Sequence, residues 1–169
     1  MKKEQKRNPV AAMAFLCYAA LMIFLLFAED RVASDGLPYW EQVKHNCSFK
    51  FFHTIGNYWD VLTRPEYYIT KWEAYGVYRF QARVALINLL GNVVMFVPLG
   101  AFLPMLWQKL QKAWKAILVG LLTVVLVELC QLLTLRGKCD VDDLLLNMAG
   151  VILGYGLWRL IGYCRRKRK

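Results

Sequence analysis

The stretch from Val84 to Trp107, VALINLLGNVVMFVPLGAFLPMLW, contains no charged residue. The hydrocarbon core of a bilayer is about 30 Å thick and is crossed by about 20 helical residues, so this stretch is long enough to span it. Two asparagines and two prolines interrupt the apolar pattern without dividing it into shorter segments. We therefore interpret residues 84–107 as a membrane-spanning helix.

Three other apolar blocks of similar length occur along the chain, and the four predicted spans are residues 10–28, 84–107, 116–135 and 143–163. A chain of 169 residues cannot enclose four such helices in a soluble core. We expect an all-α integral membrane protein in which a four-helix transmembrane bundle forms one domain over residues 1–169. The first block follows basic residues, as in a signal peptide, but it exceeds the usual apolar length of about 7–15 residues, so we retain it as an uncleaved span.

Basic residues are concentrated on one side of these spans. Twelve of the 22 Lys and Arg residues lie in residues 1–9, 108–115 and 164–169, whereas the segment 29–83 has equal numbers of acidic and basic residues. By the positive-inside rule, we expect both termini and the linker 108–115 to be cytoplasmic and the segment 29–83 to be extracellular. The net charge of +10 is then a signal of topology, and we expect no nucleic-acid partner.

The extracellular segment is rich in aromatic residues, with thirteen of the 24 in the chain. Pro65 suits the first turn of a helix, and aromatic residues recur at helical spacing from Tyr68 to Tyr75. This pattern predicts an interfacial helix that leads into the second span. The segment then acts as a lid at the headgroup level, or alternatively as an aromatic surface for a sugar or peptide.

Two other features of this segment concern metal binding and oxidation. His45, Cys47 and His53 are close in sequence but lack a recognised metal-ligand spacing, so we assign no metal site and no cofactor. Cys47 and Cys139 are the two cysteines that we expect on the extracellular side of the membrane. Nothing in the sequence brings them together, so their pairing remains an open question.

Polar side chains inside three of the predicted spans fall at one depth. At a rise of 1.5 Å per residue, they all lie in the outer half of the membrane. Glu128 should face the bundle interior, because an ionisable residue in a span costs a few kcal/mol on insertion scales. The candidate ligand-binding residues are Asn88, Asn92, Glu128, Gln131, Arg136, Asp140, Asp143 and Asn147.

The same residues also have a structural interpretation. Asparagine and glutamine often connect transmembrane helices, and Asp140 or Asp142 could cap the fourth helix. Gly150 and Gly154 form a small-xxx-small pair, which favours close helix packing over binding. The residues alone therefore leave a packing network and a ligand site as equal alternatives.

The order of these motifs resembles that of a known family. The run NLLGNVVMFVPLG at 88–100 is followed by Glu128-x-x-Gln131, Arg136, Asp140-Val-Asp142-Asp143 and Asn147-x-x-Gly150-x-x-x-Gly154. Together they resemble the VanZ-like family of bacterial membrane proteins, and the specific likeness covers roughly residues 84–156. Lys138-Cys139 departs from the more apolar residues expected there, so we expect this turn to have its own specificity.

The resemblance implies a small, multi-pass helical protein of the bacterial cell membrane. The named member lowers susceptibility to the glycopeptide teicoplanin without replacing the cell-wall precursor target, and most relatives have no assigned function. Our first hypothesis is that the polar cluster binds an amphiphile at the outer leaflet. This ligand is either a teicoplanin-type lipoglycopeptide or a membrane lipid or lipid-linked envelope precursor.

Two alternatives remain. In the first, Glu128, Asp140 and Asp143 act as an acid/base or metal-binding set in an enzyme that processes a lipid-linked precursor. The cluster has no neighbouring His or Ser/Lys set, so we consider an enzyme less well supported than a binding protein. In the second, the chain is a small transporter subunit, which would require an oligomer because four spans show no internal repeat.

Overall fold

The computed structural model describes residues 9–27, 36–72, 75–137 and 139–167. It confirms the expected all-α membrane bundle, since four of its helices are long and apolar enough to cross a membrane. The predicted cytoplasmic residues 1–8 and 168–169, and the beginning of the segment 29–83, lie outside the described residues. In chain order, the elements are α1 (Pro9–Phe27), α2 (Tyr39–His45), β1 (Cys47–Ser48), α3 (His53–Thr63), α4 (Pro65–Trp72), α5 (Tyr75–Leu106), η1 (Gln108–Leu110), α6 (Ala113–Thr134), β2 (Cys139–Asp140) and α7 (Val141–Lys167).

The second long helix is longer than predicted. α5 begins at Tyr75 rather than at Val84, and its 32 residues exceed the number that a bilayer core requires. The predicted membrane span begins at Val84, inside α5, because hydropathy locates the membrane crossing, whereas charged residues such as Arg79 and Arg83 are good helix formers and extend the helix before it. α7 likewise continues past Tyr163, through the basic residues that follow the apolar block.

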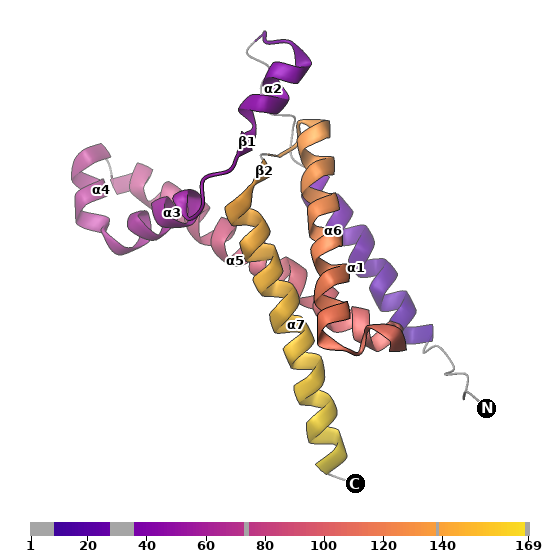
Figure 1. Cartoon of the computed structure of the whole chain (residues 1–169). Helices are drawn as coiled ribbons and strands as arrows, with labels where there is room; N and C mark the ends of the chain where they lie inside the picture. Colours follow the sequence, from indigo (N-terminus) through magenta and orange to yellow (C-terminus); the bar gives the residue numbers. More distant parts are fainter. Residues whose placement is uncertain (1–8, 28–35, 73–74, 138, 168–169) are drawn as a thin grey trace.

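α5 and α7 cross at close range in the centre of the bundle (Figure 1). A Cβ atom at Gly150 would lie 2.2 Å from the carbonyl oxygen of Val93, and one at Gly154 would lie 1.9 Å from that of Val97. On the facing helix, a Cβ atom at Gly100 would lie 2.0 Å from the carbonyl oxygen of Val151. The predicted packing role of the glycine pair is therefore confirmed, because any side chain there would separate the two backbones.

α6 has one buried face and one exposed apolar face. Its buried residues recur at every fourth position, as Ala116, Gly120, Val124, Glu128 and Leu132. Large exposed leucines lie on the other side of the helix, among them Leu122 and Leu126. This pattern suits a helix with one face toward lipid, and it places Glu128 toward the bundle interior, as expected.

α1 packs against α5 through aromatic and polar contacts. The Tyr18 hydroxyl donates a 2.8 Å hydrogen bond to the backbone carbonyl of Met95. The Phe15 ring lies edge-on to the rings of Phe102 and Trp107, with both pairs of ring centroids 5.6 Å apart. These contacts hold α1 beside the middle and the C-terminal end of α5.

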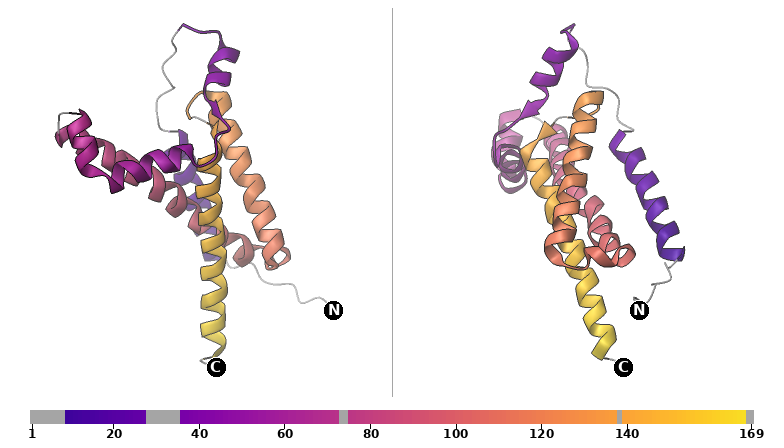
Figure 2. Two further views of the ribbon diagram at one scale, coloured as in Figure 1. Left: turned by 60° about the vertical axis from the view of Figure 1, so that its left-hand side comes forward. Right: turned by 45° about the vertical axis from the view of Figure 1, so that its right-hand side comes forward.

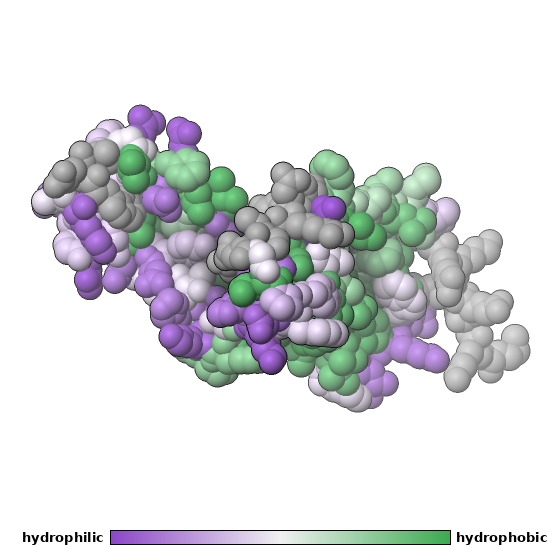
Figure 3. Space-filling view, turned by 90° about the horizontal axis from the view of Figure 1, so that it is seen from above, coloured by the Kyte–Doolittle hydropathy of each residue, from purple (hydrophilic) through white to green (hydrophobic). Residues whose placement is uncertain are grey.

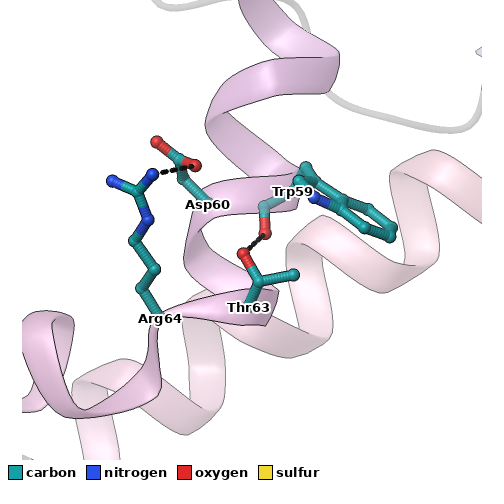
Figure 4. Close-up of polar contacts among 4 residues, drawn as sticks. All are labelled: Trp59, Asp60, Thr63 and Arg64. Atoms are coloured by element: carbon teal, nitrogen blue, oxygen red, sulfur yellow. Dashed lines mark hydrogen bonds and ion pairs between the residues drawn. The ribbon is translucent and has the colours of Figure 1, made fainter.

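α3 and α4 lie beside the N-terminal part of α5 and project sideways from the bundle (Figures 1 and 2). α4 begins at Pro65, as predicted. Where α3 ends, Arg64 forms a 3.7 Å ion pair with Asp60, and the Thr63 hydroxyl donates to the carbonyl of Trp59 (Figure 4). Hydrophilic residues gather on this projecting arm, whereas hydrophobic residues cover much of the side away from it (Figure 3).

A short parallel pairing attaches the segment before α3 to the turn before α7. Cys47 lies opposite Cys139 in this pairing, and Ser48 lies opposite Asp140. The backbone N–H of Cys139 also donates a 2.8 Å hydrogen bond to the carbonyl of Asn46. The structure thus brings together the two cysteines that the sequence left apart, and both are free thiols.

Candidate functional site

A cavity of about 610 Å³ lies at the end of the bundle where α3 meets α5, α6 and α7. Its lining includes every candidate ligand-binding residue from the sequence: Asn88, Asn92, Glu128, Gln131, Arg136, Asp140, Asp143 and Asn147. Its volume falls within the range of about 300–1,000 Å³ that is typical of ligand pockets. The polar residues of three separate helices therefore surround one space.

Glu128 and Asn147 form the most deeply buried polar pair at this site. The Asn147 side-chain nitrogen donates a 2.9 Å hydrogen bond to Glu128 Oε1. The exposed fractions are 5% for Glu128 and 3% for Asn147. Asn147 Oδ1 is buried and accepts no hydrogen bond from the described residues. Turning the amide round would place this oxygen beside the carboxylate, so the observed orientation is the one that Glu128 requires.

Asp143 is held by Asn92, which faces it across the cavity. Asn92 Nδ2 donates a 2.7 Å hydrogen bond to Asp143 Oδ1, which links α5 to α7. Asn88 does not join this network, because its Nδ2 donates instead to the Val84 carbonyl of its own helix at 2.8 Å. Asn88 therefore lines the cavity without connecting two helices.

Gln131 and Arg136 close the end of α1. Gln131 Nε2 donates a 3.0 Å hydrogen bond to the carbonyl of Leu26, and Arg136 Nη1 donates to the carbonyl of Phe27. The last carbonyls of a helix have no partner within it, and a cation near them is favourable for the helix dipole. The two side chains thus have a structural role in addition to their place in the cavity wall.

Asp140 and Asp142 bind backbone N–H groups at the starts of two different helices, α7 and α3. Asp140 Oδ1 accepts a 3.1 Å hydrogen bond from the Asp142 N–H at the start of α7. Asp142 is fully buried, and its carboxylate accepts hydrogen bonds from the backbone N–H groups of Phe52, Thr54 and Ile55 at 2.6–3.1 Å. Asp140 is therefore the cap of α7, and Asp142 holds the first turn of α3 against the bundle.

Sequence reasoning did not select two cavity residues that α3 contributes. The Thr54 hydroxyl donates a 2.5 Å hydrogen bond to Asp140 Oδ2, and Tyr58 lines the wall beside it. Burial, together with the nearby carboxylates of Asp143 and Asp140, raises the pKa of the Tyr58 hydroxyl, which keeps its proton at neutral pH. No sequence pattern identifies these residues, because their position depends on where α3 docks.

One wall of the cavity is apolar and reaches the surface of the bundle. It is formed by Leu25 and Leu26 of α1 and by Ile87 and Met95 of α5. The Ile87 side chain is 69% exposed and that of Leu25 is 44% exposed. The cavity therefore combines a polar interior with apolar residues that continue onto the lipid-facing surface.

The described residues contain no group of three His, Cys, Asp or Glu side chains that is close enough to hold a metal ion. His45 and His53, which the sequence places near Cys47, do not line the cavity. The cavity offers hydrogen bonding and charge, supplied by three carboxylates, four amides, two hydroxyls and one guanidinium.

No curated protein sequence and no solved structure matches this chain. The model of one family does match, over residues 14–162, a range that includes all of α5 and α6, most of α1 and α7, and every residue that lines the cavity. Because the match covers most of the chain, this protein belongs to the VanZ/LLP1 family.

Proposed function

We propose that this protein resides in the bacterial cell membrane with both termini in the cytoplasm, and that it binds an amphiphile in the cavity from the outer leaflet. By doing so it lowers susceptibility to teicoplanin-type lipoglycopeptide antibiotics. The ligand is either the drug itself or an envelope lipid whose handling alters access of the drug. The distribution of basic residues supports the orientation, since 1–9, 108–115 and 164–169 are strongly basic.

The observation that carries this proposal is that the cavity has a polar interior and an apolar wall. Carboxylates and amides from α5, α6 and α7 surround its interior, whereas Leu25 and Ile87 continue it onto the lipid-facing surface. A molecule with a polar head and an acyl chain can satisfy both parts at once. A purely polar solute would leave the apolar wall unused, and a purely apolar one would leave the buried polar groups unpaired.

A filling variant tests this proposal without removing any polar group. Gly91 lines the cavity, and a Cβ atom there meets no other atom within 4 Å. Gly91→Phe should fill the cavity and abolish drug tolerance in a bacterial host that depends on this protein. Gly76→Phe is the matched control, because Gly76 lies in open space on the same helix and does not line the cavity.

The readout is growth in the presence of teicoplanin and of a glycopeptide that lacks an acyl chain, with membrane levels of each variant measured in parallel. Loss of tolerance in Gly91→Phe alone supports the proposal. Full tolerance in Gly91→Phe and in a Glu128→Ala, Asp143→Ala double variant, at normal membrane levels, would show that the cavity is not used.

The orientation has its own test. Cys164 lies near the C-terminal end of α7, and Cys47 lies at the other end of the bundle, beside β2. A membrane-impermeant maleimide applied to intact cells should leave Cys164 unlabelled until the membrane is opened. Labelling of Cys164 from outside would reverse the topology and remove the outer-leaflet site.

Turnover of a lipid-linked precursor by purified protein would favour the enzyme alternative, which uses Glu128, Asp140 and Asp143 of the same cavity.

A further inference from the structure

The polar part of the cavity has more hydrogen-bond acceptors than it can satisfy. Glu128, Asp140 and Asp143 each present a carboxylate, and Asn147 adds the buried Oδ1 atom that accepts no hydrogen bond from the described residues. A buried acceptor without a partner is unfavourable, so a molecule that donates a hydrogen bond to it gains free energy on binding.

The amide donors around these acceptors are already engaged in part. Asn147 Nδ2 is directed at Glu128, and Asn92 Nδ2 is directed at Asp143. The side-chain nitrogens of Asn88 and Gln131 donate to backbone carbonyls instead. Each carboxylate therefore has a neutral hydrogen-bond partner that orients it, and further acceptor capacity remains.

The charges in the cavity are also unbalanced. Within the part of the chain that the structure describes, Glu128, Asp140 and Asp143 form no ion pair. Among the described residues of the lining, Arg136 is the one cationic side chain, and it donates to the end of α1. Anions in a poorly solvated site repel one another and attract a cation more strongly than they would in water.

We propose that the ligand of this cavity is an ammonium-bearing amphiphile, whose protonated amine is held between Glu128 and Asp143 while its acyl chain follows the apolar wall. This inference rests on the proposed function and specifies the head group that the site selects. An ammonium group supplies three N–H donors and one positive charge, which matches the surplus of acceptors and the unpaired carboxylates. A head group that carries a phosphate or sulfate but no amine would meet these carboxylates with like charge alone.

The geometry of the wall gives the acyl chain a route. Ile87 of α5 and Leu25 of α1 both line the cavity and are also exposed on the outside of the bundle. A head group that enters between these helices would therefore leave its chain in contact with the lipid. The amine would reach Glu128 and Asp143 without the chain having to enter the buried interior.

The test uses the full-length protein in phosphatidylcholine nanodiscs, titrated with two probes that differ in one group. The probes are dodecyl glucosaminide, which has a free amine, and the same glycoside with its amine acetylated. We expect the free amine to bind at least about tenfold more tightly, a difference equivalent to about 1.4 kcal/mol. In Glu128→Gln and in Asp143→Asn this ratio should fall several-fold. It should be unchanged in Asp60→Asn, because Asp60 pairs with Arg64 on the arm.

Competition against the glucosaminide distinguishes the source of the ligand. Displacement by phosphatidylethanolamine indicates a membrane lipid, and displacement by teicoplanin indicates the drug. Equal affinity for the two glycosides in the unaltered protein would overturn the ammonium proposal. If both bind and Gly91→Phe abolishes binding, the amphiphile site itself stands. If neither glycoside nor either competitor binds, the ammonium proposal and the proposed function both fail.

Discussion

Asn147 of α7 donates a 2.9 Å hydrogen bond to Glu128 of α6, and both side chains are almost completely buried. This bond joins two membrane helices at the cavity wall. It also fixes the orientation of the Asn147 amide, because the NH₂ group must face the carboxylate. The same contact therefore joins the two helices and leaves Asn147 Oδ1 without a hydrogen-bond donor among the described residues.

Replacing this amide with a carboxylate should destabilise the bundle. Asn147→Asp has nearly the same shape but removes the donor and places a second carboxyl group against Glu128. The loss of a buried hydrogen bond to a charged group is worth about 2 kcal/mol, or about 4–8 °C in Tm for a chain of this size. Thermal unfolding in nanodiscs at neutral pH measures the change. Asn88→Asp is the control and should change Tm less, because Asn88 bonds within its own helix.

A second prediction concerns the attachment of α3. Asp142 accepts hydrogen bonds from the N–H groups of Phe52, Thr54 and Ile55, so Asp142→Ala should release the first turn of α3. Amide hydrogen exchange should then accelerate at these three positions by at least about tenfold, since the N–H groups lose their acceptor. Exchange in the centre of α6 should be unchanged. Unaltered protection at Thr54 in this variant would show that other contacts hold α3.

Much of the site was predictable because its polar residues interrupt otherwise apolar helices. Asn92, Glu128 and Asn147 stand out in apolar helices, and the regular rise of a helix places them at one depth. The role of Asp142 was not predictable, because the groups that it binds are backbone N–H groups and these have no sequence signature. The sequence predicted a helix that leads into the second span, but not that one helix runs from Tyr75 through the span, since hydropathy reports where lipid ends and not where a helix ends.

The close crossing of α5 and α7 gives a third prediction. Gly154→Ala places a Cβ atom 1.9 Å from the Val97 carbonyl oxygen, so the helices must separate. Overpacking of this kind costs about 1–3 kcal/mol, and we expect Tm to fall by about 3–10 °C. Gly156→Ala is a matched control two residues away on the same helix, where a Cβ atom meets nothing within 4 Å. Its Tm should stay equal or rise slightly, because alanine has the higher helix propensity.

A Gly154→Ala protein with unchanged Tm would mean that α5 and α7 do not approach as closely as the structure indicates. Gly100→Ala tests the same crossing from the other side, since its Cβ atom would lie 2.0 Å from the Val151 carbonyl oxygen. The two substitutions affect the same interface, so the combined loss in Tm should be smaller than the sum of the separate losses.

The last prediction concerns the two cysteines of the β1–β2 pairing. Cys47 and Cys139 are directly opposed in neighbouring strands, a separation that is compatible with disulfide geometry. Copper phenanthroline should therefore cross-link them within one chain, as detected by mass spectrometry of the linked peptides. Burial, and next the Cys47 thiol, raises the pKa of the Cys139 thiol to about 11. Since the thiolate is the reactive form, alkylation of Cys139 should be slow at pH 8 and should accelerate as the pH approaches 11.

Cys164 provides the comparison for both measurements, because it is exposed on α7 and far from the pairing. In opened membranes at pH 8 it should react with iodoacetamide well before Cys139 does. Faster alkylation of Cys139 than of Cys164, or a cross-link between Cys47 and Cys164, would contradict the β1–β2 register.

With the expected cross-link in place, the segment before α3 is tied covalently to the turn before α7. Release of α3 by Asp142→Ala should then be smaller in the oxidised protein than in the reduced one, because the closed loop restricts how far α3 can move.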